Sequence, residues 1–485
     1  MEVFSLDRRS FLRTCGGLAQ GVAAAGFVRA AISAPSAVLL NASRVLAASP
    51  EPLIQLQETS SQDGILSTTL MAAPKRVHLG DFSFDGFLYN DEYIPPLLRV
   101  RLGDSLRISF RNDLLDYPSN LHFHGMSVSP QGNSDNVFIH VHPGQQFQYE
   151  VHIPRTGRQG PGLFWYHPHA HGFVEKQILG GMSGGLIVDG SDQLYPMLRG
   201  LEERSFFIKH IEVGTDSELI SINGQINPVV QIRPGEMQFW RIGHIGATLF
   251  IKFRIEGMPL YVVARDGHPL TQPQKVSDFF VGPGERIEAI ALGPEPGEYP
   301  MMTIPFQDQA WRKPFPAQQL AIVISSGSNG STVDEAEILR QRVQGNAWID
   351  DRAAPIAHRR VLTYSRTPDR KVFMIDGRIM EEDRVDQVVH LGDTEEWTIV
   401  NTDQQYHSFH IHQTPFLVTA INGVPQTQDS LRDTYSVPPA DEVGPGSMTV
   451  VIPFTDPVIA GKFVYHCHAV DHEDKGMMGV IEVIA

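Results

Sequence analysis

The chain repeats one supersecondary pattern three times, and this repeat limits the folds that are open to it. Each copy has a short run of alternating apolar and polar residues, then a glycine and an acid, then a second alternating run with a polar end. The three copies span residues 100–112, 231–244 and 389–401. Alternation with a period of two predicts β-strands, and regular repetition of a strand-turn-strand unit predicts consecutive β-sandwich or barrel domains.

A second pattern recurs in each third of the chain, where a glycine stands five residues before a side chain that could bind a metal. These pairs are Gly162 and His167, Gly297 and Met302, and Gly461 and His466. We therefore expect three homologous β-domains at about residues 50–195, 196–350 and 355–485, with residues 327–352 as a connection. A chain of 485 residues fits about three domains. The middle domain, which has Met instead of His, is expected to be a metal-free spacer.

Eight histidines form four His-x-His pairs, two in the first domain and two in the third. The pairs are His122 and His124, His167 and His169, His410 and His412, and His466 and His468. A neutral imidazole is a common ligand of copper and zinc. One such pair is more often structural than ligating, but four pairs at repeated positions favour metal binding. Eight imidazoles suit three copper ions, shared as two, three and three.

Cys467 lies between the last two of these histidines and is followed by His472 and Met477. One thiolate, two imidazoles and a weak axial thioether are the ligands of a blue-copper electron-transfer site. Neighbours in a strand point to opposite faces, so His466 and His468 are expected at a second metal site. His407 is the expected second imidazole of the blue site. Zinc is disfavoured, because one thiolate and this many imidazoles do not suit a closed tetrahedral site.

These motifs resemble the four copper-binding motifs of three-domain bacterial multicopper oxidases, a family that includes laccases and cuprous oxidases. The resemblance covers the chain after its N-terminal segment. It implies an all-β chain of three consecutive cupredoxin-like domains, each a Greek-key β-sandwich or barrel. It also implies four coppers per chain, namely one type 1, one type 2 and two type 3 ions.

The resemblance assigns each ligand by its position in a motif. The type 1 ligands would be His407, Cys467 and His472, with Met477 as the axial ligand and Met478 as the only rival. The type 2 ligands would be His122 and His410. The two type 3 coppers would be held by His124, His167 and His468, and by His169, His412 and His466.

The resemblance implies that one-electron oxidation of a donor at type 1 copper is coupled to four-electron reduction of O2 to water at a trinuclear cluster. Protons must reach this cluster, and acidic side chains are natural donors. Glu473 matches a position of the family that supplies protons. Asp135 resembles the family's other acidic position.

The sequence predicts the electron donor less closely than it predicts the reaction. We expect phenols or aryl amines, as for a laccase, because the 14 methionines form no run like the insert of the cuprous oxidases. The alternative is a metallo-oxidase of Cu(I), Fe(II) or Mn(II) in metal tolerance, which needs acids such as Asp471, Glu473 or Asp474 to face His407 or His472. A copper nitrite reductase would lack the four pairs. A non-enzymatic cell-envelope binding protein of this fold is disfavoured because all the ligands are present.

The first 47 residues are expected to form a twin-arginine signal peptide. Arg8 and Arg9 precede Phe11 and Leu12, a weakly apolar run follows, and Val45-Leu46-Ala47 resembles a peptidase site. Removal of this segment would take Cys15 with it and leave Cys467 as the only cysteine. We expect export by the twin-arginine machinery to the periplasm or beyond, with no membrane anchor. A net charge of −16 disfavours nucleic-acid partners.

Overall fold

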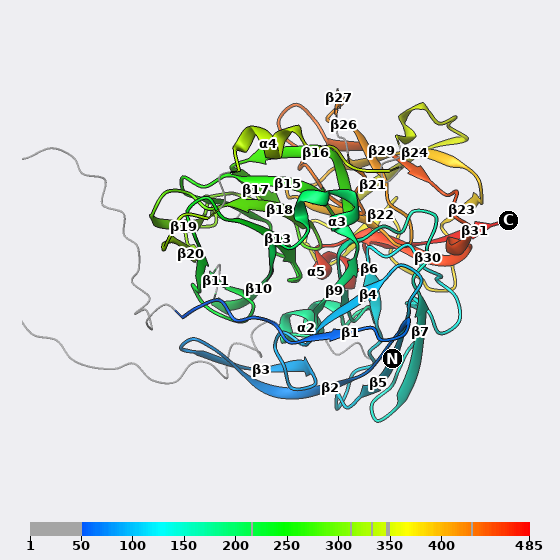
Figure 1. The fold of residues 1–485 in the computed structure, drawn as a ribbon. Helices are drawn as coiled ribbons and strands as arrows, with labels where there is room; N and C mark the ends of the chain where they lie inside the picture. The colour runs from blue at the N-terminus through cyan, green and yellow to red at the C-terminus, as the bar shows by residue number, and fades with distance from the viewer. Residues whose placement is uncertain (1–50, 215–216, 311–312, 331–332, 346–349, 428–429) are drawn as a thin grey trace, which may run out of the picture. The chain divides into compact units, whose positions relative to one another are not determined.

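A computed structural model describes residues 51–485 apart from 215–216, 311–312, 331–332, 346–349 and 428–429. The expected signal peptide lies outside the described residues. Strands are the main secondary structure of the described chain, and in chain order they fall into six β-sheets that form three pairs (Figure 1). The prediction of an all-β protein is confirmed. The described residues contain no helix that is both long enough and apolar enough to span a membrane.

The first pair consists of a five-stranded sheet, ordered β1-β4-β9-β8-β6, and a four-stranded sheet, ordered β3-β2-β5-β7. Its strands are β1 (Glu58–Ser60), β2 (Ile65–Leu79), β3 (Phe82–Tyr89), β4 (Leu97–Arg101), β5 (Ser105–Asn112), β6 (His122–His124), β7 (Gln146–His152), β8 (Gly162–His167) and β9 (Gly184–Asp189).

The second pair consists of a six-stranded sheet, ordered β11-β10-β13-β18-β15-β16, and a five-stranded sheet, ordered β12-β20-β19-β14-β17. Its strands are β10 (Glu202–Gly214), β11 (Ser217–Ile222), β12 (Val229–Ile232), β13 (Met237–His244), β14 (Ile251–Ile255), β15 (Leu260–Arg265), β16 (His268–Val276), β17 (Asp278–Val281), β18 (Arg286–Leu292), β19 (Gly297–Thr303) and β20 (Gln319–Ser325).

The third pair repeats this plan, with sheets ordered β22-β21-β24-β29-β26-β27 and β23-β31-β30-β25-β28. Its strands are β21 (His358–Arg366), β22 (Phe373–Ile375), β23 (Gln387–His390), β24 (Thr394–Asn401), β25 (His407–Ile411), β26 (Leu417–Ile421), β27 (Val424–Pro425), β28 (Thr434–Val437), β29 (Gly446–Pro453), β30 (Gly461–Cys467) and β31 (Met478–Ile484).

The helices between the strands are short. They are α2 (Val174–Gly180), α3 (Ser191–Leu194), α4 (Glu335–Arg340), α5 (Val470–Asp474) and the 3-10 turns η1 (Pro196–Leu198), η2 (Asp351–Ala353) and η3 (Pro457–Ile459).

The glycine-acid turn of the sequence repeat carries the chain from one sheet of a pair to the other. In each copy the strand before the turn (β4, β12 or β23) lies in one sheet of its pair. The strand after the turn (β5, β13 or β24) lies in the other sheet of the same pair. The turn glycines Gly103, Gly235 and Gly392 have φ of +93°, +71° and +103°. Residues with a side chain rarely adopt this conformation, which explains why glycine recurs there.

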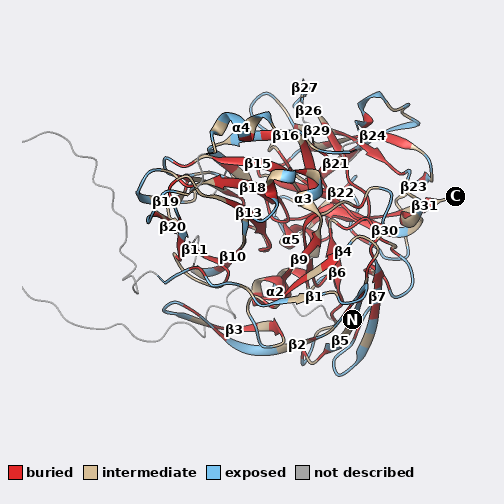
Figure 2. Ribbon diagram, viewed as in Figure 1, coloured by how far each residue is buried: buried red, intermediate tan, exposed pale blue. Residues whose placement is uncertain are grey.

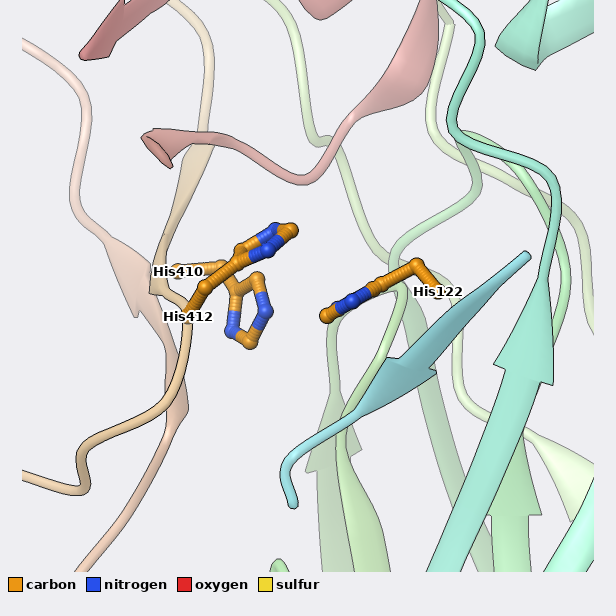
Figure 3. Close-up of side chains that lie close together, drawn as sticks. All are labelled: His122, His410 and His412. Carbon is orange, nitrogen blue, oxygen red and sulfur yellow. The ribbon is translucent and has the colours of Figure 1, made fainter. Parts of the chain in front are cut away.

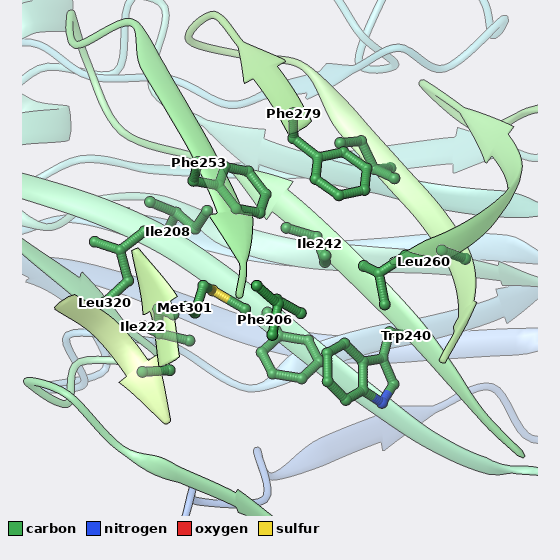
Figure 4. Packing of buried hydrophobic residues seen from close by; sticks show 14 of the residues in the cluster. Phe206, Ile208, Ile222, Trp240, Ile242, Phe253, Leu260, Phe279, Met301 and Leu320 are labelled. Atoms are coloured by element: carbon green, nitrogen blue, oxygen red, sulfur yellow. The ribbon is translucent and has the colours of Figure 1, made fainter. Parts of the chain in front are cut away.

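Each pair of sheets encloses its own apolar core, and the buried residues gather in the interior of the described chain (Figure 2). In the middle pair Trp240 packs beside Phe206 with ring centroids 4.8 Å apart (Figure 4). The indole N–H of Trp240 donates to Gln238 at 2.9 Å, which removes the cost of burying an unpaired donor. These cores fix the strands that bear the histidines.

Candidate metal centre

The four His-x-His pairs lie on neighbouring strands of two sheets. In the first sheet β6 pairs with β8, and His122 stands directly opposite His167. In the last sheet β25 pairs with β30, and His410 stands opposite His466. Because the strands in each sheet are antiparallel neighbours, each pairing brings two His-x-His motifs together at one end of the sheet.

The histidines of the first sheet lie against those of the last sheet, and the eight imidazoles form one group that we call the histidine cluster. The ring of His122 stacks on that of His412 with centroids 3.7 Å apart, and His124 stacks on His410 at 3.9 Å. Figure 3 shows His122 facing His410 and His412 across this contact. The Nε2 atom of His466 lies 3.2 Å from Nε2 of both His169 and His412. All eight side chains are buried.

The members of some predicted ligand sets lie closer together than those of others. Donor atoms of His169, His412 and His466, the set predicted for one type 3 copper, lie within 4.8 Å of one another. His122 and His410 form such a group together with His412. The rings of His124, His167 and His468 have centroids 4.6 to 5.8 Å apart. The binding of one ion by each set stays a prediction.

The unpaired nitrogens of the cluster fit a bound metal. Among the described residues, Nε2 of His122, His167 and His410 is buried and has no hydrogen-bond partner. Buried polar atoms normally have partners, and each orphan costs about 1–3 kcal/mol. Burial also lowers the pKa of every imidazole in the cluster, to about 3 for His167 and His466. The rings are therefore neutral near pH 7, which is the form that binds copper.

Three side chains on the other face of the Cys467 strand form a second group, the sulfur site. The Nδ1 atoms of His407 and His472 lie 3.3 and 3.5 Å from Sγ of Cys467, and 3.1 Å from each other. Burial raises the pKa of the Cys467 thiol, so a thiolate there requires a cation beside it. One soft sulfur and two nitrogens are the donor set that copper favours.

The packing of the two methionines distinguishes between the candidate axial ligands. Met477 is fully buried in the same core as Cys467. Its amide N–H donates to the His472 carbonyl at 3.0 Å, and its carbonyl accepts from the Cys467 amide at 3.1 Å. Met478 packs in a separate core with Met380. This arrangement favours Met477.

The two candidate proton donors lie against the histidine cluster. Asp135 oxygens lie 3.0 and 3.1 Å from Nδ1 of His122, and Oδ2 accepts from Gln413 at 2.8 Å. The Glu473 oxygens lie 3.0 Å from Nδ1 of His466 and 3.5 Å from Nε2 of His169. Burial raises the pKa of both carboxyl groups to about 7.

The other acids near His472 point in different directions. Asp474 caps α2 by accepting from the amides of Val174 and Glu175 at 3.1 and 2.7 Å. Asp471 lies 3.6 Å from Nε2 of His472, but Lys475 neutralises it at 3.0 Å.

The other imidazole of the sulfur site also has an acid beside it. Asp403 lies 3.7 Å from Nε2 of His407 and pairs with Arg366 at 2.5 Å. Asp403 and Asp471 are thus each paired with a cation.

Two buried residues that the sequence analysis did not single out complete the far side of the histidine cluster. Arg286, from the middle pair of sheets, pairs with Asp433 through both guanidinium nitrogens at 2.7 and 2.6 Å. Its Nη1 lies 3.2 Å from Nδ1 of His124. A Cβ on Gly125 would stand 2.3 Å from this guanidinium, so the glycine after His124 makes room for it. The expected spacer therefore contributes a side chain to the cluster.

Aromatic rings cover both groups. The indole of Trp165 stacks on His167 with ring centroids 4.3 Å apart. The ring of Phe373 stacks on His472 at 4.1 Å. His407 is fully buried and His472 is 4% exposed, so the protein screens both imidazoles of the sulfur site from bulk solvent.

Comparison with known proteins agrees with the fold and the donor set. Three profiles described as multicopper oxidase match residues 71–193, 199–328 and 354–485. The multicopper oxidase mco of Staphylococcus haemolyticus is 24% identical over 453 residues, which cover 88% of this chain and 90% of that protein. The laccase of Bacillus subtilis is 23% identical over 401 residues, covering 70% and 74%.

Among solved structures, the multicopper oxidase of Campylobacter jejuni, described as a metallo-oxidase, superposes with a TM-score of 0.74 at 23% identity. The match covers 90% of this chain and 95% of that one, and it confirms the cupredoxin-like fold. Together with the match of three family profiles over most of the sequence, the fold and the sulfur and nitrogen donors lead to one conclusion: the chain belongs to the multicopper oxidase family.

Proposed function

We propose that the protein oxidises phenols or aryl amines at a type 1 copper and reduces O2 to water at a trinuclear copper cluster. Four bound coppers would supply the electron transfer and the four-electron reduction of O2. The sulfur site would hold type 1 copper, with Met477 as axial ligand. The histidine cluster would hold the type 2 and both type 3 ions, shared as the sequence motifs predict.

The observation that carries this proposal is the position of Cys467 between two cluster histidines. Its side chain belongs to the sulfur site, whereas His466 and His468 point into the histidine cluster. One peptide bond therefore links each of these histidines to the residue at the other site. Alternation of side chains along β30 produces this link without any further element.

Two carboxyl groups are placed to transfer protons at the histidine cluster. Asp135 accepts from Nδ1 of His122, which fixes the tautomer and leaves Nε2 free to bind a metal. Glu473 sits between His466 and His169, where a protonated carboxyl could give a proton to reduced oxygen. We propose Asp135 as both a positioning residue and a proton group, and Glu473 as a proton donor.

The charges around the sulfur site favour an organic donor. A metal-ion donor would need free carboxylates there, but Asp403 and Asp471 are paired with Arg366 and Lys475. The same two acids are also what supports the metallo-oxidase alternative, because each lies within 4 Å of an imidazole of the sulfur site. Relatives described as a laccase and as a metallo-oxidase both occur.

The organisation of the chain completes the proposal. We propose domains at residues 50–195, 196–350 and 355–485, and a twin-arginine signal in residues 1–47 that directs export to the periplasm.

Oxygen uptake by the copper-loaded protein tests the function. A phenol, an aryl diamine, Cu(I), Fe(II) and Mn(II) would each be supplied as the only donor. Uptake with the phenol and the diamine is the expected result. Uptake with one metal ion alone would establish the metallo-oxidase alternative, and no uptake with any donor would contradict an oxidase and favour a binding role.

A further inference from the structure

A cavity of about 540 Å³ lies between the middle and last pairs of sheets. Its walls come from β15, β16 and β17 on one side, and from the segments around β25, β26 and β28 on the other. This volume lies in the range of sites for small organic molecules.

Among the described residues that line the cavity, one cation forms no ion pair with another side chain. Arg432 pairs with Asp266 at 2.5 Å and with Glu285 at 2.9 Å, and Asp278 pairs with Arg254 at 3.0 Å. Among the described residues the guanidinium of Arg265 has neither a hydrogen bond nor an ion pair. Burial and the nearby Arg432 lower the pKa of Arg265, whereas Glu285 and Asp266 act in the opposite direction. Both of these acids already pair with Arg432, so a carboxylate of a ligand could still pair with the Arg265 guanidinium.

Aromatic rings form another part of the wall. Tyr406, Phe280 and Tyr435 line the cavity, and the rings of Tyr406 and Phe280 lie 5.4 Å apart. Phe250 and Phe306 pack behind Tyr406 at 5.7 and 5.4 Å and hold its ring in place. Such walls favour a flat aromatic ligand.

One residue that lines the cavity is the sequence neighbour of a residue of the sulfur site. Tyr406 precedes His407, so their Cα atoms are about 3.8 Å apart. Both imidazoles of the sulfur site are covered, and a donor therefore has to deliver its electron through a neighbouring group. The backbone between Tyr406 and His407 offers such a connection from this cavity.

We propose that this cavity binds aromatic acids, with the carboxylate on Arg265 and the ring against Tyr406, and that phenolic acids are donors of the enzyme. The proposal rests on the proposed function and deepens it. Each phenol would lose one electron to the type 1 site and its O–H proton to solvent, and four such events would reduce one O2 with four protons to two water molecules. The positive charge of Arg265 disfavours a metal cation beside it in the cavity.

Calorimetry with benzoate tests binding separately from activity, because benzoate carries the ring and the carboxylate but has no phenol to oxidise. The copper-loaded wild type is expected to bind benzoate. Arg265→Gln should weaken binding about tenfold, which corresponds to loss of one charge-assisted hydrogen bond. Arg265→Lys should weaken it less, and Arg199→Gln, a change at an exposed arginine, should leave it unchanged.

Kinetics with syringate and its methyl ester test the link to turnover, since the ester differs mainly by the lost charge. We expect Arg265→Gln to raise KM for syringate about tenfold and to leave KM for the ester unchanged. Benzoate binding that is absent, or unaffected by Arg265→Gln, would overturn the inference. An equal effect on syringate and its ester would also overturn it. Benzoate binding that depends on Arg265, in a protein that oxidises no donor, would uphold the site and refute only the proposed oxidase.

Discussion

At the scale of single residues, the properties of the sulfur site follow from what surrounds Cys467. Its sulfur accepts from the Ser408 amide at 3.4 Å and otherwise faces two imidazoles and an apolar core. In a dry environment each ligand of a bound copper would have a larger effect on the reduction potential, because no water competes for the charge. The proposed axial side chain would be the ligand to replace with least disturbance, since an axial thioether binds weakly.

Met477→Leu should therefore raise the reduction potential of the type 1 site and preserve the blue absorption band. Leucine has nearly the same volume, so the core around Cys467 is kept, but it removes the thioether that stabilises oxidised copper. Potentiometric titration of the blue band measures the effect. Met478→Leu is the matched control and should leave the potential unchanged. The opposite pattern would move the axial role to Met478.

Glu473→Gln should slow turnover about a hundredfold while the blue band stays intact. The amide keeps the shape of the side chain but cannot donate an acidic proton, and proton donors of this kind contribute at least about that factor. Steady-state oxygen uptake measures the loss. Asp474→Asn is the control, because Asp474 caps α2 and does not contact the histidine cluster. Equal rates for Glu473→Gln and the wild type would remove Glu473 from the proton path.

At the scale of elements, the last residue of the repeated strand organises the loop that follows it. Asn112 donates to the carbonyls of Tyr117 and Val141, and Asn401 donates to those of Gln405 and Pro438. These loops lead to β6 and β25, which bear the first His-x-His pair of each outer sheet. The asparagine thus fixes where the histidine strands begin.

His244 takes the same place in the middle copy. It ends β13, and its ring nitrogens contact the Leu249 carbonyl at 2.7 Å and the Gly246 amide at 3.3 Å. The imidazole thus contacts backbone groups of the loop that follows, as the asparagine does in the other two copies. A repeat in the sequence reveals the position but does not reveal which backbone groups it satisfies.

Asn401→Ala should lower the stability of the protein by about 1–3 kcal/mol, because it leaves buried backbone groups without partners. The temperature of unfolding of the copper-loaded protein measures the change, compared with Asn133→Ala, whose side chain makes an exposed hydrogen bond. His244→Asn should cost less than His244→Ala. An Asn401→Ala protein as stable as the Asn133→Ala control would refute this role.

The sequence predicted the parts of the molecule that repeat. Strand alternation gave the all-β fold, and the glycine spacing identified β8, β19 and β30, which begin at Gly162, Gly297 and Gly461. The His-x-His pairs identified side chains that the fold does bring together. In contrast, Arg286 and Asp433 have no repeated counterpart and lie 147 residues apart, so only the tertiary structure shows that they meet. The cavity beside Tyr406 likewise depends on two segments that no local pattern connects.

At the scale of the whole molecule, one buried network joins all three pairs of sheets at the histidine cluster. Arg286 binds Asp433 of the last pair, and its Nε donates to the Leu163 carbonyl of the first pair at 3.1 Å. Its own amide donates to Asp266 at 2.7 Å, and Asp266 also binds Arg432. A buried pair of this kind adds little stability over apolar residues, but it is costly to break, because the remaining charge has no water.

Arg286→Met should therefore destabilise the protein by about 3–5 kcal/mol, since it leaves the Asp433 carboxylate buried without its cation. It should also reduce the type 2 copper signal in paramagnetic resonance, because Asp433 accepts from Thr434, and the Asp433 carbonyl lies 2.7 Å from Nδ1 of His410. The double variant Arg286→Met with Asp433→Asn should recover part of the stability, as no unpaired charge remains.

Arg359→Met removes the exposed pair with Glu396 and should cost less than about 1 kcal/mol. If Arg286→Met lowered the stability of the protein no more than this control does, the middle sheets would only separate the outer ones. A large loss that the double variant relieves would show that the middle sheets help to hold the cluster. The comparison separates these two roles because both variants remove one arginine, and of the two only Arg286 lies beside the histidine cluster.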